Sequence, residues 1–125
     1  MAHTSEYRHV AIRPVAGALG AEIDGVDLAQ PMAEDTAEEI RRALLEYLVI
    51  FFREQVLAPE DLLTFAAHFG KPMEYPQVKG LPECPQVTSV TKLAHETINF
   101  GGAWHSDTSY LPCPPMASML YAVES

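Results

Sequence analysis

His105 and Asp107 are the residues of this sequence best suited to metal chemistry. They stand two positions apart in residues 100–110, a segment rich in aromatic and β-compatible side chains. If the segment is extended, His105 and Asp107 point to one face and Ser106 to the other, so an imidazole nitrogen and a carboxylate oxygen converge on one point. These are two of the three ligands of the 2-His-1-carboxylate triad of non-haem Fe(II) oxygenases. The alternative is a hydrogen-bonded histidine beside a solvated aspartate at a strand end.

A facial iron site needs its protein ligands on one side of the ion, because three of the six octahedral positions stay open. Two ligands from one strand meet this need, since the strand fixes their separation, and the third ligand must come from elsewhere. Gly101 and Gly102 would allow an unusual backbone or a close approach by substrate. A serine hydrolase built from Ser106, His105 and Asp107 is excluded, because neighbours on a strand face opposite ways while that triad needs successive contacts.

The first half of the chain carries the periodicities of helices and strands. Apolar residues at helical spacing predict a helix over residues 34–48, and Pro59 and Gly70 are typical of the start and end of a second helix. Alternating or continuous apolar residues predict three strands, over residues 7–14, 19–28 and 48–52.

The charged side chains of this half are interpreted as structural. Glu22 and Asp24 could be metal ligands but are typical of a solvated strand face. Arg53 is expected to pair with Glu54 or another acidic residue. Glu38 and Arg42 stand four residues apart on the first predicted helix and form a candidate i,i+4 ion pair.

The second half is expected to position the site. Residues 71–85 contain four prolines and predict an irregular loop. β-Branched and alternating residues predict strands over residues 86–91, around Trp104 and over residues 117–123. Trp104 is expected to pack in the core beneath the site strand.

Two further residues are candidates for substrate binding, Asn99 and Tyr75. Asn99 could hydrogen-bond a substrate above the metal or cap the turn before Gly101. Tyr75, like Tyr110, could line a pocket or pack in the loop and core.

The composition indicates a folded domain and argues against several classes of binding partner. The chain has 125 residues, of which 48% are hydrophobic, which is enough for one small folded domain. A net charge of −9 argues against nucleic acid or an anionic membrane as a partner. Residues 1–6 lack the apolar core of a secretory signal. Cys84 and Cys113 lie outside any C-x-x-C motif and are interpreted as thiols of a reducing cytoplasm.

Four motifs in order along the chain resemble the Fe(II)/2-oxoglutarate dioxygenases of the taurine dioxygenase (TauD/TfdA) family. The decisive one is WHSDT at residues 104–108. The other three are GAEIDGVDL at 20–28, LVIFFREQ at 48–55 and FAAHFG at 65–70. Each motif is weak alone, but together they span nearly the whole chain.

The resemblance implies an α+β fold, a double-stranded β-helix (jelly roll) with flanking helices. It implies that His105 and Asp107 ligate Fe(II), with 2-oxoglutarate and O2 as cosubstrates. The expected reaction hydroxylates a small organic, often anionic, substrate and releases succinate and CO2. Sulfonates, sulfate esters and phenoxy acids are the favoured substrates.

The sequence departs from the family at its C-terminal end. The family's third ligand, a histidine, and an arginine that pairs with 2-oxoglutarate stand far downstream of the H-x-D motif. Residues 1–125 are therefore expected to be a partial domain, the N-terminal part of such an enzyme. His95, in a predicted loop, is poorly placed to complete the triad. The alternative is a non-catalytic interaction domain that keeps part of the fold, and unpaired strand edges would favour a homo-oligomer.

Overall fold

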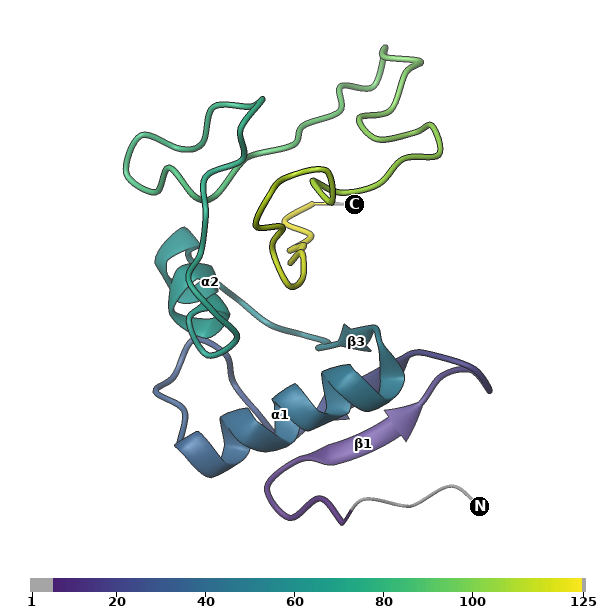
Figure 1. The fold of residues 1–125 in the computed structure, drawn as a ribbon, viewed down its shortest axis with the longest axis vertical. Helices are drawn as coiled ribbons and strands as arrows, with labels where there is room; N and C mark the ends of the chain where they lie inside the picture. The colour runs from purple at the N-terminus through teal and green to yellow at the C-terminus, as the bar shows by residue number, and fades with distance from the viewer. Residues whose placement is uncertain (1–5, 125) are drawn as a thin grey trace. The chain divides into compact units, whose positions relative to one another are not determined.

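The structure, a computed structural model, describes residues 6–124 (Figure 1). Its elements are strands β1 (Ala11–Pro14) and β2 (Ala21–Asp24), helix α1 (Glu34–Tyr47), strand β3 (Ile50–Phe51) and helix α2 (Pro59–Ala66). The described chain divides into two compact units at the Asp61–Leu62 bond, within α2.

The first unit is built on a three-stranded sheet with β2 in the centre. β1 pairs with β2 antiparallel, with Ile12 opposite Ile23. β3 pairs with β2 in parallel, with Ala21 opposite Ile50. A parallel neighbour requires a crossover connection, and α1 provides it. Because β2 is paired on both edges, its residues Ala21–Ile23 are buried.

Helix α1 covers this sheet and supplies the core of the first unit (Figure 1). Its apolar face buries Ala37, Ile40 and Ala43, and Ile40 is completely enclosed. The helix ends at Leu48, whose backbone is in the left-handed region with φ 67°. The N–H of Gly20 donates to the carbonyl of Tyr47 at 2.8 Å and so ties the start of β2 to the end of the helix.

The two helices and three strands predicted in the first half of the chain are confirmed, and each is shorter than predicted. The strand predicted over residues 48–52 is reduced to Ile50–Phe51. The predicted pair of Glu38 with Arg42 is wrong, because Arg41, one turn away at i,i+3, contacts Glu38 instead. Arg42 lies over the ring of Tyr7, with its guanidinium carbon 4.5 Å from the ring centroid.

The second unit differs most from expectation. The loop predicted over residues 71–85 is confirmed, but the strands predicted over residues 86–91, around Trp104 and over 117–123 are wrong: residues 67–124 form turns, bends and irregular backbone. A strand persists only where a neighbouring strand pairs with its N–H and C=O groups. No stretch of residues 67–124 supplies such a partner. No helix among residues 6–124 is long and apolar enough to cross a membrane.

Candidate functional site

The structure brings His105 and Asp107 together in the second unit. Nε2 of His105 lies 3.2 Å from Oδ1 of Asp107, and both side chains are about half exposed, at 53% and 57%. The sequence predicted this convergence from an extended strand, but the backbone there forms bends and turns. The two groups lie close because they stand two residues apart in an irregular segment that bends at Asp107 and Thr108.

Two neighbours fix the ring of His105. Its Nδ1 lies 2.7 Å from the carbonyl oxygen of Ala103, and a carbonyl can only accept, so Nδ1 carries a proton. In the neutral ring the free lone pair is then at Nε2, which faces Asp107. Gly101, with φ 69°, lies against the ring: a Cβ at this position would stand 3.1 Å from Cε1 of His105.

Each oxygen of Asp107 has a polar neighbour. Oδ1 faces His105, and Oδ2 accepts a hydrogen bond from the hydroxyl of Ser118 at 3.4 Å. The next residue, Thr108, is buried and has φ 46°, which is uncommon for a β-branched residue and turns the chain sharply after Asp107. Backbone strain of this kind is concentrated at functional sites.

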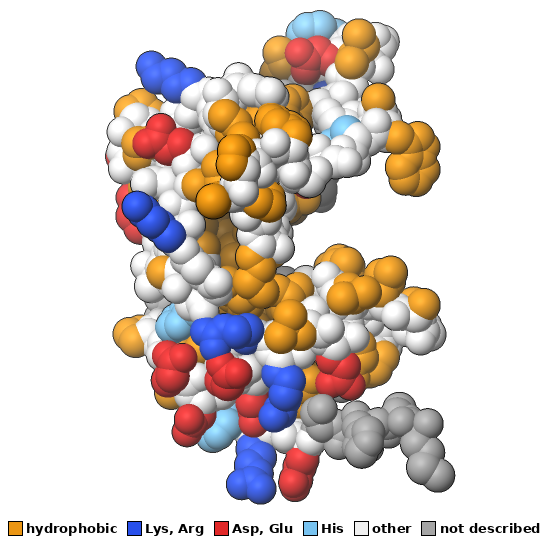
Figure 2. Space-filling model, in the orientation of Figure 1, with side chains coloured by type: hydrophobic (Ala, Val, Ile, Leu, Met, Phe, Trp, Pro, Cys, Tyr) orange, Lys and Arg blue, Asp and Glu red, His pale blue; other side chains and the backbone are white. Residues whose placement is uncertain are grey.

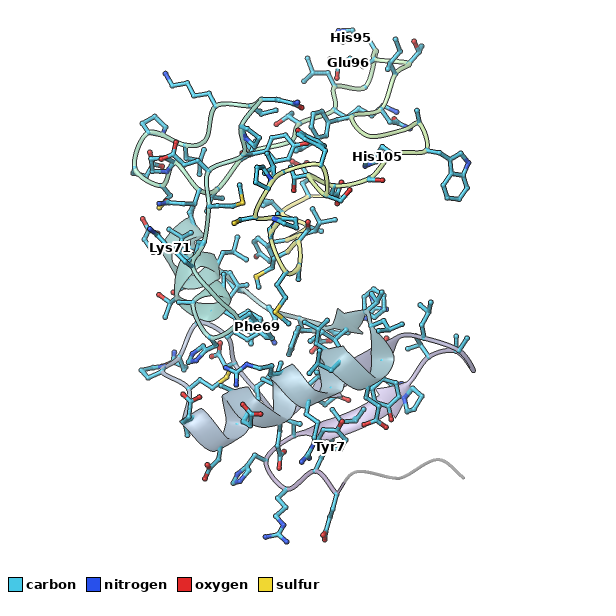
Figure 3. The ribbon with its side chains drawn as sticks, in the orientation of Figure 1. Tyr7, Phe69, Lys71, His95, Glu96 and His105 are labelled. Atoms are coloured by element: carbon cyan, nitrogen blue, oxygen red, sulfur yellow. The ribbon has the colours of Figure 1, made fainter. Side chains whose placement is uncertain are left out.

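This arrangement fits two ligands of a divalent cation. A lone pair on Nε2 and an anionic oxygen 3.2 Å away repel one another unless a proton or a cation lies between them. A third ligand is not close by: no group of three or more His, Cys, Asp or Glu within residues 6–124 could hold a metal. His95 and His105 come from different bends of the chain (Figure 3).

The remaining predicted site residues lie apart from this pair or on the surface. Asn99 is exposed, and its carbonyl accepts the N–H of Gly102 at 3.1 Å, so the residue opens a turn. Tyr75 is 37% exposed. Tyr110 accepts a hydrogen bond from Gln77 at 2.9 Å. The core position predicted for Trp104 is wrong, because its side chain is fully exposed.

Three polar residues are more important structurally than the sequence indicated: Glu22, Glu39 and Ser118. The solvated face predicted for Glu22 is wrong, because its side chain is only 11% exposed and bridges Arg13 and Arg53. Arg53 thus pairs with an acidic residue, as predicted, though not with its neighbour Glu54. Acidic and basic side chains also lie beside one another on the face of the first unit seen in Figure 2.

The environment of Glu22 stabilises its charged form. The hydrogen bond from Arg53 is the largest cause of a lowered pKa at Glu22. Burial acts in the opposite direction and raises the pKa, but the charges of Arg13 and Arg53 add to the hydrogen bond and outweigh it. Glu22 is therefore a buried structural carboxylate between two guanidinium groups.

Glu39 joins α1 to the segment before β1. Its carboxylate accepts the backbone N–H groups of Arg8, His9 and Val10 at 2.8, 2.9 and 3.3 Å. Burial acts to raise the pKa of Glu39, but these three hydrogen bonds and the charge of His9 outweigh it, so the pKa lies below its usual range.

A hollow of about 600 Å³ opens in the first unit. Its wall includes Asp24, Asp27, Arg53 and Glu54 and none of the predicted site residues. The convergent chemistry is therefore at His105 and Asp107, not in this hollow.

Comparison with known protein families gives a match to "Taurine catabolism dioxygenase TauD, TfdA family" over residues 11–125. The chain belongs to this family. The predicted family resemblance is thus confirmed over nearly the whole chain, and it includes the segment that holds His105 and Asp107.

Curated relatives of this TauD/TfdA chain include sulfate ester enzymes. It is 34% identical over 113 residues to an alpha-ketoglutarate-dependent sulfate ester dioxygenase of Pseudomonas putida, covering 90% of this chain and 36% of the relative. It is 31% identical over 114 residues to an alkylsulfatase of Acinetobacter baylyi, covering 90% of this chain and 35% of the relative. The chain therefore spans about a third of the length of these relatives.

Several solved structures are similar to this chain in fold and sequence. A taurine dioxygenase from Burkholderia xenovorans matches with a TM-score of 0.58 and 34% identity over 62% of this chain and 28% of the other. A putative alpha-ketoglutarate-dependent taurine dioxygenase from the same organism matches with a TM-score of 0.57 and 39% identity over 61% and 28%. A third match, with a TM-score of 0.50 and 30% identity over 51% and 23%, is AAD-2 in complex with Mn(II) and N-oxalylglycine.

Proposed function

We propose that the protein carrying this sequence is an Fe(II)/2-oxoglutarate-dependent dioxygenase in which Nε2 of His105 and Oδ1 of Asp107 are two of the iron ligands. The observation that supports this most directly is the convergence of these atoms at 3.2 Å, with Nδ1 of His105 already engaged by the Ala103 carbonyl. A metal-binding histidine commonly donates its other N–H to a carbonyl in this way.

When bound, the iron supplies the oxidative chemistry that couples decarboxylation of 2-oxoglutarate by O2 to hydroxylation of the substrate. The chain itself contributes orientation. Ala103 fixes the tautomer of His105, and the bend ending at Thr108 holds Asp107 beside it. The third ligand and the arginine for 2-oxoglutarate are proposed to come from outside residues 6–124, in a jelly-roll domain of which residues 1–125 form the N-terminal part.

The proposed substrate is a small organic anion, with a sulfate ester or sulfonate as the first choice. The names of the Pseudomonas putida and Acinetobacter baylyi relatives support this choice. Asn99 and Tyr75 remain the proposed substrate-binding residues, since both are exposed polar residues of the second unit. A cytoplasmic location fits an exposed thiol at Cys113, which a reducing compartment preserves.

The test is 2-oxoglutarate turnover with and without an alkyl sulfate, measured as succinate formed in the presence of Fe(II). His105→Ala and Asp107→Ala are each expected to lower turnover at least about a hundredfold, because each removes a ligand that orients the metal. Ser106→Ala is the matched control, since this exposed residue stands between the ligands, and its turnover should equal that of the unmodified protein.

Unaltered turnover in His105→Ala would contradict the proposal. Absence of any iron-dependent turnover would favour the second candidate, a non-catalytic interaction domain. That candidate is motivated by the lack of a third ligand near the pair within residues 6–124. For this candidate we also propose self-association. Exposed apolar side chains such as Leu45 and Leu48 favour it. Analytical ultracentrifugation would measure it.

A further inference from the structure

We infer that Ser118 is a positioning residue that keeps Asp107 ligating the metal through one oxygen. This inference rests on the proposed function, because it concerns how a ligand is held. It begins from the contact between the Ser118 hydroxyl and Oδ2 of Asp107 at 3.4 Å. Ser118 stands eleven residues after Asp107, and the irregular backbone between them, which contains Pro114 and Pro115, brings it back to Asp107.

The two oxygens of Asp107 have different partners. Oδ1 faces Nε2 of His105 at 3.2 Å, the position from which both can reach one ion. Oδ2 is the acceptor for the hydroxyl of Ser118 at 3.4 Å. An uncommitted carboxylate could rotate and offer both oxygens to a cation, whereas a hydroxyl donor at Oδ2 opposes the rotation.

The number of oxygens matters for the chemistry. A carboxylate that binds through both oxygens occupies an additional coordination position, while a facial site works only with three positions open for cosubstrates. Residues that hydrogen-bond to ligating carboxylates orient them, and their loss commonly weakens metal affinity about ten- to hundredfold. The hydrogen bond from Ser118 is long, at 3.4 Å, and the Asp107 side chain is about half exposed. We therefore expect the loss of metal affinity to be at the lower end of this range.

The experiment measures Mn(II) affinity by electron paramagnetic resonance under anaerobic conditions, with and without 2-oxoglutarate. Ser118→Ala is expected to weaken Mn(II) binding about tenfold and to weaken 2-oxoglutarate binding to the Mn(II)-loaded protein. Ser118→Thr keeps the hydroxyl and should restore both affinities. Ser106→Ala, an exposed serine nearer to Asp107 in sequence, should leave both unchanged.

A purely structural role for Ser118 would lower the thermal midpoint in Ser118→Ala without changing the affinity of the folded protein for Mn(II), and that result would overturn the inference. The inference would also be overturned if Ser118→Thr bound Mn(II) as weakly as Ser118→Ala. If His105→Ala and Asp107→Ala lose Mn(II) binding while Ser118→Ala does not, only this inference fails. If the unmodified protein binds no Mn(II), or the ligand variants bind it equally well, the proposed function fails as well.

Discussion

At the scale of residues, the site depends on small groups placed around one imidazole. Ala103 contributes only a backbone carbonyl, and Gly101 has no side chain to collide with the imidazole ring. Gly101 has φ 69°, a conformation that costs other residues roughly 1–2 kcal/mol. Its position against the ring of His105 leaves a Cβ only 3.1 Å from Cε1. A side chain at this position would therefore require the imidazole ring to shift by a few tenths of an ångström.

Gly101→Ala should consequently displace His105 and weaken Mn(II) binding about tenfold, since an orienting contact is lost. The measurement is the Mn(II) dissociation constant. Gly17→Ala is the control, because a Cβ there meets nothing within 4 Å. Equal affinities in Gly101→Ala and the unmodified protein would show that the close approach does not restrain the ring.

At the scale of elements, a buried carboxylate joins α1 to the segment before β1. Glu39 accepts hydrogen bonds from three backbone N–H groups, and that of the buried Val10 is the one that most needs an acceptor within the protein. Its lowered pKa means that this stabilisation is present above the unfolded pKa, about 4.3, and is lost as the pH falls through the folded value.

Glu39→Gln is expected to lower the free energy of unfolding at pH 7 by about 2 kcal/mol, because hydrogen bonds to a charged acceptor are replaced by weaker neutral ones. Urea unfolding at pH 7 and pH 3 would measure this. The difference between variant and unmodified protein should be smaller at pH 3 than at pH 7, because the stabilisation by Glu39 diminishes as the pH falls below the unfolded pKa. Glu38→Gln, on the exposed face of α1, should change stability by less than about 0.5 kcal/mol; an equally large loss there would contradict the special role of Glu39.

At the scale of the whole molecule, regular structure is concentrated in the first unit. The sheet and α1 lie there with most of the buried apolar residues, whereas residues 67–124 contain turns and irregular backbone. Segments with few backbone partners open at low free energy, and a ligand that binds the folded form suppresses such opening.

Amide hydrogen exchange should therefore be slow in β2 and α1 and fast over residues 86–124. Mn(II) should slow exchange at residues 101–108, because binding to His105 and Asp107 favours the backbone conformation that brings them together. The same slowing in the His105→Ala variant would mean that the metal acts elsewhere. Protection over residues 86–91 before metal is added would mean that the strand predicted there forms in solution.

The sequence by itself determined the family, through the resemblance of four motifs in order. It also determined the helices and the nearness of His105 to Asp107, because these follow from local spacing. Helical periodicity marked α1 and α2 from their own residues, and a two-residue separation keeps two side chains close in a bend as well as in a strand. Tertiary structure alone decided where strands persist, that Glu22 is buried between two arginines, and that Ser118 reaches Asp107. Each of these depends on groups distant in the sequence: a strand needs a neighbouring strand, and a buried charge or an oriented carboxylate needs partners that only the folded chain brings close.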